Sequence, residues 1–137
     1  MRLSDWPERF QQVINEHENI PFEYGVNDCA IFSGKILEAL TGHDFYSSFI
    51  GRYKTKIGGF RQFRKATGHK SHVHFIKAKF EEVPVAFAQV GDLAILNSED
   101  GPAVVVIAGQ FAIGLNNIGL VRFPIEQVSN AYRVEGV

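Results

Sequence analysis

Cys29 is the residue of this sequence best placed for nucleophilic chemistry, and it is the only cysteine among the 137 residues. It directly follows Asn27 and Asp28, two residue types that cap helix N-termini, and an apolar helical pattern begins after it. The N-terminus of a helix carries partial positive charge, which favours a thiolate over a thiol. The sequence therefore predicts a reactive cysteine with a lowered pKa, and the alternative is a small buried residue without chemistry.

A nucleophilic cysteine needs a general base, and histidine is the usual one. His72 and His74 are two residues apart in a segment that reads as a strand, so both are expected on one face. His43 follows the far end of the cysteine helix, roughly 18 Å away by helical rise, and His17 ends the first predicted helix. Two histidines at this spacing can also bind a metal, but no third ligand is evident and no metal site is predicted.

Three helices are expected in the first half of the chain, at residues 5–17, 28–42 and 58–67. Ser4 or Asp5 is the expected cap of the first, and Asp5 with Glu8 has the spacing of a capping box. In the third, Phe60 and Phe63 are expected to face inward. The second has the broadest apolar face, so it should be the central helix of the fold.

The period of the apolar pattern changes after residue 70. Five strands are expected, at residues 73–76, 92–96, 103–108, 111–115 and 120–123. The last four are joined by short links, which indicates antiparallel pairing, and the strand at 103–108 is apolar on both faces, which indicates an inner position. Helices followed by strands predict one α+β domain over residues 1–137, with the cysteine helix packed on a sheet of about five strands.

The charge of the chain is unevenly distributed. There are 14 Lys and Arg against 15 Asp and Glu, for a net charge of −1. Residues 45–80 nevertheless contain nine cations and no acid. Such a segment indicates contact with a polyanion, unless the fold mixes it with the acidic flanks. The pI of about 6.5 and the lack of a nucleic-acid motif make nucleic acid an unlikely partner. No apolar run reaches the length of a membrane span.

Residues 21–32, PFEYGVNDCAIF, resemble the nucleophile motif of the NlpC-type cell-wall peptidases. Residues 90–94 (VGDLA) and 103–109 (AVVVIAG) are similar to two strands of the same family. The resemblance is closer to a small phage-encoded branch, in which Gly-x-Asn-Asp-Cys-Ala is followed some twenty residues later by Gly-Arg-Tyr. Gly51-Arg52-Tyr53 and Gly119-Leu120 fit that branch.

The resemblance implies a papain-like fold with Cys29 as nucleophile, Asp28 beside it in the catalytic motif and Asn116 as the residue that orients the base. The family histidine corresponds to Pro102 or Ala103, neither of which is a base, so His72 or His74 is the substitute candidate. A tyrosine of the family corresponds to Phe22, which lacks the hydroxyl. The substrate groove is expected to involve Phe22, Tyr24, Arg52 and Tyr53.

The implied function is that of a phage tail-tip protein resembling a peptidoglycan hydrolase, a cysteine peptidase whose activity is in doubt without the usual histidine. The alternative is a non-catalytic structural or assembly component of the tail tip with the same fold. A third hypothesis, nucleic-acid binding by residues 45–80, is disfavoured. The implied partners are other phage tail proteins and bacterial peptidoglycan. The implied location is the virion, after synthesis in the host cytoplasm, and no cofactor is implied.

Overall fold

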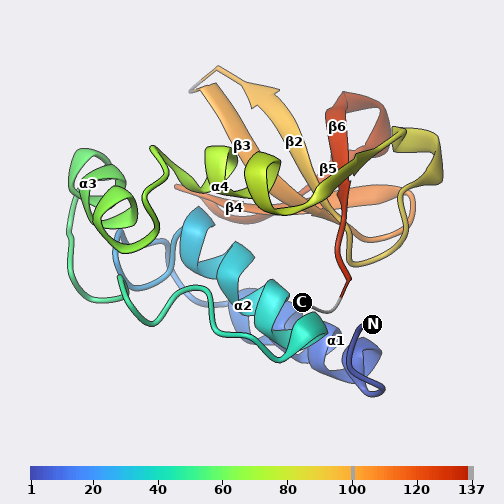
Figure 1. Ribbon diagram of the computed structural model, residues 1–137, viewed down its shortest axis with the longest axis horizontal. Helices are drawn as coiled ribbons and strands as arrows, with labels where there is room; N and C mark the ends of the chain where they lie inside the picture. The colour runs from blue at the N-terminus through green and yellow to red at the C-terminus, as the bar shows by residue number, and fades with distance from the viewer. Residues whose placement is uncertain (100, 136–137) are drawn as a thin grey trace.

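The computed structural model describes residues 1–99 and 101–135 and has the expected α+β architecture (Figure 1). The helices are α1 (Trp6–His17), α2 (Cys29–Thr41), α3 (Lys56–Thr67) and α4 (His72–Lys79). The strands are β1 (Glu81–Val83), β2 (Leu93–Ser98), β3 (Gly101–Ile107), β4 (Phe111–Asn116), β5 (Gly119–Pro124) and β6 (Val128–Arg133). Two short 3₁₀ helices, η1 (Val85–Phe87) and η2 (Ile125–Gln127), join strands.

The strands form one six-stranded sheet in the order β1-β6-β2-β3-β4-β5, with every neighbouring pair antiparallel. The four predicted strands from residue 92 onward are confirmed as the meander β2 to β5, and β3 is an inner strand as expected. Its side chains alternate between two apolar clusters, with Val104 and Val106 toward the helices and Val105 and Ile107 on the opposite face. Strands β1 and β6, which complete the sheet on one side, were not expected from the sequence.

The cysteine helix α2 is central, as expected, because it lies between α1 and the sheet (Figure 1). Its apolar residues Phe32, Ile36 and Leu40 are at most 1 % exposed and belong to the main core. Gly42 ends it in the left-handed conformation with φ of 81°, which a residue with a Cβ adopts only at a cost. Among the described helices, none has the length and apolar character to cross a lipid bilayer.

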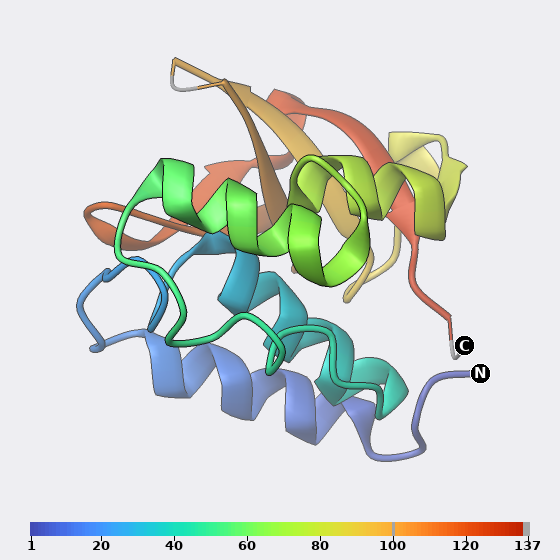
Figure 2. The same ribbon diagram turned by 60° about the vertical axis from the view of Figure 1, so that its left-hand side comes forward.

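The strand expected at residues 73–76 is wrong, because these residues belong to α4. Ser71 caps this helix by accepting a hydrogen bond from the His74 N–H. The buried residues Val73 and Ile76 are three apart, which puts them on one face of a helix but on opposite faces of a strand. His72 and His74 therefore do not share a face in the way that a strand would have placed them. In Figure 2, α4 and α3 lie on the same side of the molecule, next to the sheet.

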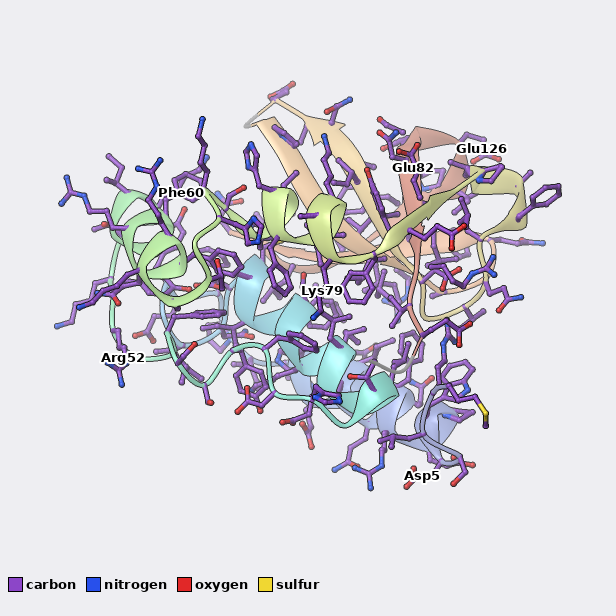
Figure 3. All side chains as sticks on the ribbon, viewed as in Figure 1. Asp5, Arg52, Phe60, Lys79, Glu82 and Glu126 are labelled. Atoms are coloured by element: carbon purple, nitrogen blue, oxygen red, sulfur yellow. The ribbon has the colours of Figure 1, made fainter. Side chains whose placement is uncertain are left out.

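Two smaller expectations are also wrong. Asp5 precedes α1 but does not cap it, because its carboxylate pairs with the Arg9 guanidinium, at 2.8 Å, and the capping box with Glu8 is absent. In α3, Phe63 is buried as expected, whereas Phe60 is 41 % exposed. Figure 3 shows Phe60 at the outer edge of the molecule.

Asp92 ties the two ends of the described chain to the sheet. Its side chain is fully buried and accepts hydrogen bonds from Arg2 (2.8 Å), Arg133 (3.2 Å) and the backbone N–H groups of Gln89 and Val134. Arg2 also donates to the carbonyl oxygen of Val134. The Gly-Asp pair at residues 91–92 is thus structural, since each carboxylate oxygen already has two donors.

We expect Asp92→Asn to lower the free energy of unfolding by about 3 kcal/mol, because it breaks buried charge pairs and removes an acceptor. Urea unfolding followed by circular dichroism measures this. Asp5→Asn removes an exposed ion pair and is the matched control, for which little change is expected. Equal effects of the two substitutions would contradict the structural role of Asp92.

Candidate functional site

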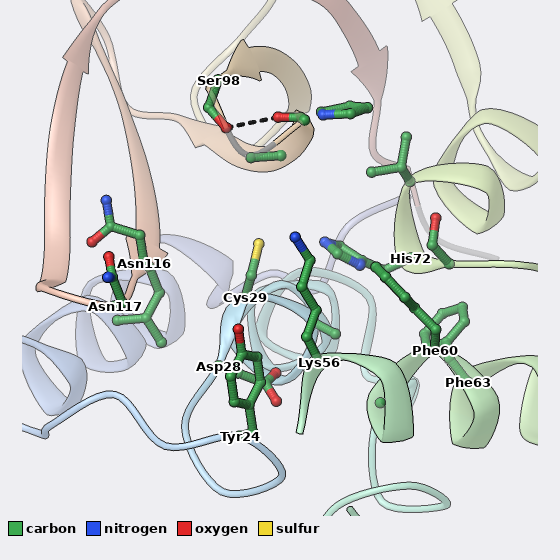
Figure 4. Close-up of a pocket in the computed structure, with 18 of the residues that line it drawn as sticks. Tyr24, Asp28, Cys29, Lys56, Phe60, Phe63, His72, Ser98, Asn116 and Asn117 are labelled. Carbon is green, nitrogen blue, oxygen red and sulfur yellow. Dashed lines mark hydrogen bonds between the residues drawn. The ribbon is translucent and has the colours of Figure 1, made fainter. Parts of the chain in front are cut away.

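A cavity of about 730 Å³ opens beside Cys29, between the N-terminal end of α2, the helices α3 and α4, and the ends of strands β2 to β4 (Figure 4). The preceding loop and the start of α2 form one wall, and α3 with the start of α4 forms another. The remaining wall is the β2–β3 hairpin and the β4–β5 turn. The cavity lining contains these residues: Phe22, Tyr24, Asp28, Cys29, Ala30, Tyr53, Lys56, Gly59, Phe60, Phe63, Lys70–His74, Ser98, Gly101–Ala103 and Leu115–Asn117.

Cys29 is the first residue of α2, as predicted, and it is partly buried in the cavity wall. Its thiol donates a hydrogen bond to the carbonyl oxygen of Val104 on β3, at 3.3 Å. Burial raises the pKa of this thiol to about 11, and the negative charge of Asp28 adds to the rise. The expected lowering of the pKa is therefore wrong for the free protein. The loss of hydration outweighs the partial positive charge of the helix terminus.

Asp28 holds the cysteine in place. One carboxylate oxygen caps α2 by accepting the Ile31 N–H at 3.0 Å, and the other accepts the Gly25 N–H at 2.9 Å. The second oxygen also accepts a hydrogen bond from the hydroxyl of Tyr53. Burial, with this hydrogen bond, raises the pKa of Tyr53 and so keeps it a donor. Asp28 thus acts on Cys29 in two ways: it fixes the start of the helix, and its negative charge raises the pKa of the thiol.

The two short motifs of the resemblance meet at this carboxylate. Gly25 has φ of 82°, and a Cβ at this position would collide with the carbonyl oxygen of Tyr53. Its own carbonyl oxygen accepts the Gly51 N–H at 2.6 Å. The Gly-x-Asn-Asp-Cys and Gly-Arg-Tyr segments therefore form one packed unit, although Asp28 and Tyr53 are 25 residues apart in the sequence.

Of the two candidate bases, His72 is the better placed. Both His72 and His74 line the cavity, but His74 is exposed and its Nδ1 lies 2.8 Å from the Ser71 hydroxyl. The Nε2 atom of His72 is buried and has no hydrogen-bond partner in the described part of the chain. Figure 4 shows the His72 ring reaching into the cavity that Cys29 faces from the opposite wall. Burial lowers the pKa of His72 to about 4, so its imidazole is neutral at pH 7.

The other predicted site residues are only partly brought together. Phe22, Tyr24 and Tyr53 line the cavity, as does Asn116, whose side-chain oxygen accepts the Ile118 N–H at 2.9 Å and so fixes the β4–β5 turn. Arg52 is exposed and does not line the cavity; Figure 3 shows it at the periphery. The expectation that it shapes the groove is wrong, because the chain turns between Gly51 and Tyr53 and directs the tyrosine inward.

The histidines at the ends of the first two helices lie outside the site. His17 is 1 % exposed and packs edge-on against Phe32, with 5.2 Å between ring centroids. Neither His17 nor His43 lines the cavity. Over residues 1–99 and 101–135, no group of three His, Cys, Asp or Glu side chains is arranged to hold a metal ion.

One face of α3 belongs to the site and was missed from the sequence. Lys56, Gly59, Phe60 and Phe63 all line the cavity, and their spacing of three, four and seven residues marks one face of a helix. The spacing is visible in the sequence, but from sequence alone Phe60 and Phe63 are equally well explained as residues that face the core.

The start of α2 also provides two free backbone donors. Asp28 accepts the N–H groups of Ile31 and Phe32 through its side chain and its carbonyl oxygen. The N–H groups of Cys29 and Ala30 have no acceptor among the residues described, and both residues line the cavity. Donors of this kind stabilise an oxyanion that forms beside the sulfur.

Comparison with known families gives one match. The family model described as "Domain of unknown function (DUF6950)" matches residues 1–134, which is nearly the whole chain. No curated protein matches the sequence significantly.

We expect Tyr53→Phe to destabilise the protein by about 1–3 kcal/mol, because the buried Asp28 oxygen loses a donor. Thermal or urea unfolding measures the change. Tyr24→Phe is the matched control, because no partner of the Tyr24 hydroxyl is recorded within the described residues. Equal stability of Tyr53→Phe and the wild type would show that the hydroxyl does not support the loop.

We expect the thiol of the free protein to react slowly with iodoacetamide at neutral pH, and its rate to rise with a midpoint near pH 11. The sign follows from the raised pKa: below it the proton stays on sulfur, and only the thiolate reacts. Asp28→Asn should lower the midpoint by removing a neighbouring negative charge. In denaturant the midpoint should return to about 8.5. A native midpoint below the denatured one would contradict this electrostatic account.

Proposed function

We propose that this chain, which belongs to the DUF6950 family, is a papain-like hydrolase of the NlpC type that acts at a phage tail tip and cleaves a peptide bond of peptidoglycan. The observation that carries the proposal is the shared cavity, which is lined both by Cys29, at a helix N-terminus, and by His72, whose buried Nε2 has no hydrogen-bond partner in the described residues. A nucleophile, a base and free N–H donors are the parts that acyl transfer requires.

The reaction begins from two neutral groups. With the thiol pKa at about 11 and the imidazole pKa at about 4, the resting pair holds its proton on sulfur at pH 7. Attack of Sγ on the peptide carbonyl carbon therefore has to accompany proton transfer to His72 Nε2. The oxyanion formed is then held by the N–H groups of Cys29 and Ala30.

Collapse of this intermediate breaks the C–N bond, and the leaving amine takes the proton from His72. The product of this step is a thioester on Cys29. Water, deprotonated by His72, then attacks the thioester carbonyl. The C–S bond breaks, the acid product leaves, and the sulfur takes the proton back from His72, which restores both resting groups. The base thus comes from the helix α4, whereas the family histidine would stand at Pro102 or Ala103 on β3.

Support for the tail-tip assignment is confined to the sequence resemblance and to the packing of its two short motifs around Asp28. The proposed partners are accordingly other phage tail proteins, with peptidoglycan as substrate, and the proposed location is the virion.

A second candidate is a non-catalytic tail-tip component with the same fold. The specific observation in its favour is the thiol itself, which is protonated by virtue of its raised pKa and donates to the Val104 carbonyl. A protonated thiol whose hydrogen bond is made within the protein fits a purely structural role. The two candidates make opposite predictions for the same variants.

We expect the wild type to release soluble fragments from purified peptidoglycan and Cys29→Ala to release none. His72→Gln should reduce the rate by about 10²- to 10⁴-fold, the usual contribution of a general base. His74→Gln is the matched control, since it alters a neighbouring exposed histidine, and it should retain most of the activity. If neither the wild type nor Cys29→Ala releases fragments, the enzyme proposal is wrong and the structural candidate is favoured.

The pH profile gives a separate check on the base. His72 must be unprotonated to accept the thiol proton, and its lowered pKa keeps it unprotonated above about pH 4. The acid limb of kcat/KM should therefore lie near pH 4. An acid limb well above pH 4 would show that a group other than His72 is the base.

A further inference from the structure

The helix α3 has a second face whose charge the cavity does not use. Arg61, Arg64 and Lys65 are all exposed and lie on the side of α3 away from the buried Phe63, as 100° per residue requires. Figure 3 shows nitrogen-tipped side chains extending from this helix away from the body of the protein. Phe60, which lines the cavity, and Arg64 are four residues apart and so are neighbours on the helix surface. The basic face meets the cavity wall there, and Arg61 and Lys65 lie farther round the helix.

The charge of this region is not compensated within the described protein. All nine cations of residues 45–80 are exposed, and the segment contains no acid. The recorded ion pairs use the guanidinium groups of Arg2, Arg9, Arg122 and Arg133, all of which lie outside the segment. Leaving Lys56 aside, none of the nine pairs with an acid in the described residues. Apart from Lys56, the cations of this segment therefore stay exposed without an ion pair to the acidic flanks in the described residues.

The rim of the cavity continues this charge. Lys70, in the connection between α3 and α4, is exposed and lines the cavity. A ligand that extends out of the cavity past the start of α4 meets Lys70 and then the basic face of α3. Like charges held at this density attract an extended anionic chain more strongly than a single small anion.

We propose that the outer face of α3, formed by Arg61, Arg64 and Lys65 with Lys70 at the rim, binds carboxylates of an anionic peptide polymer while one of its peptide bonds occupies the cavity. The inference rests on the proposed function, because it names the substrate as a polymer of carboxylate-bearing peptides, the chemistry of peptidoglycan stems. Nucleic acid fits less well, since the cavity that this face adjoins is lined by Cys29 and His72, groups suited to a peptide carbonyl.

The test measures binding without catalysis. Full-length Cys29→Ala protein is sedimented with insoluble peptidoglycan, and with the same material after its carboxylates have been converted to amides. The face variant adds Arg61→Gln, Arg64→Gln and Lys65→Gln, none of which lines the cavity. The matched control adds Arg9→Gln and Arg122→Gln, two exposed cations elsewhere on the surface. Circular dichroism and thermal unfolding establish that each variant is folded.

We expect the face variant to bind intact peptidoglycan about tenfold more weakly than Cys29→Ala, and the control variant to bind as Cys29→Ala does. Cys29→Ala should bind amidated peptidoglycan as weakly as the face variant binds the intact polymer. Added salt should weaken the binding of Cys29→Ala and of the control variant to intact peptidoglycan, and should leave the weaker binding unchanged. Equal binding of intact and amidated polymer, or tighter binding to random duplex DNA, would overturn the proposal. Because all proteins here lack the thiol, a failed hydrolysis assay does not affect this result.

Discussion

The arrangement of the site depends on one buried carboxylate. Asp28 accepts hydrogen bonds from the first turn of α2, from Gly25 and from Tyr53, so it fixes the helix start and two loops at one point. Without it, the first residue of α2 has no defined place relative to the cavity. The same carboxylate also raises the pKa of Cys29 by its negative charge. The Asp28 carboxylate, which positions the sulfur beside the cavity, thus also disfavours the thiolate. The protonated thiol of the free protein is well positioned but unreactive.

The thiol shows how two effects at a helix N-terminus compete. Free N–H groups and the helix dipole favour a thiolate, but their effect is modest compared with the cost of placing a charge where water is largely excluded. The effect of burial is the larger one here, and the protonated thiol donates a hydrogen bond to the Val104 carbonyl oxygen on β3. Any reaction of the Cys29 thiol must therefore break its hydrogen bond to the sheet, and another interaction must compensate for that loss. The N–H groups of Cys29 and Ala30 provide such an interaction only once an oxyanion is present.

Much of this framework could be predicted from the sequence because it is locally encoded. Asp28 and Gly42 delimit α2, and short apolar runs joined by short links mark β2 to β5. Most of the failures have one of two physical origins: the segment is too short for its period to be read, or its place depends on a contact distant in sequence. Residues 72–79 are too few to distinguish a helix from a strand by period, and the edge strand β1 has only three residues. The hydrogen bond between Tyr53 and Asp28, which places Tyr53 in the cavity and leaves Arg52 outside, has no local signal at all.

The residues that line the cavity are divided between the two halves of the chain, and this division bears on where a base could come from. The helical half supplies the charged and ionisable groups around Cys29, including Asp28, His72 and the lysines. The sheet supplies an apolar wall, a carbonyl oxygen and the Asn116 turn, whose amide oxygen is already engaged. With Pro102 and Ala103 at the start of β3, the sheet offers no ionisable group there. The proposed proton acceptor for the sulfur therefore comes from the helical half, where His72 of α4 lines the cavity and its buried Nε2 has no partner in the described residues.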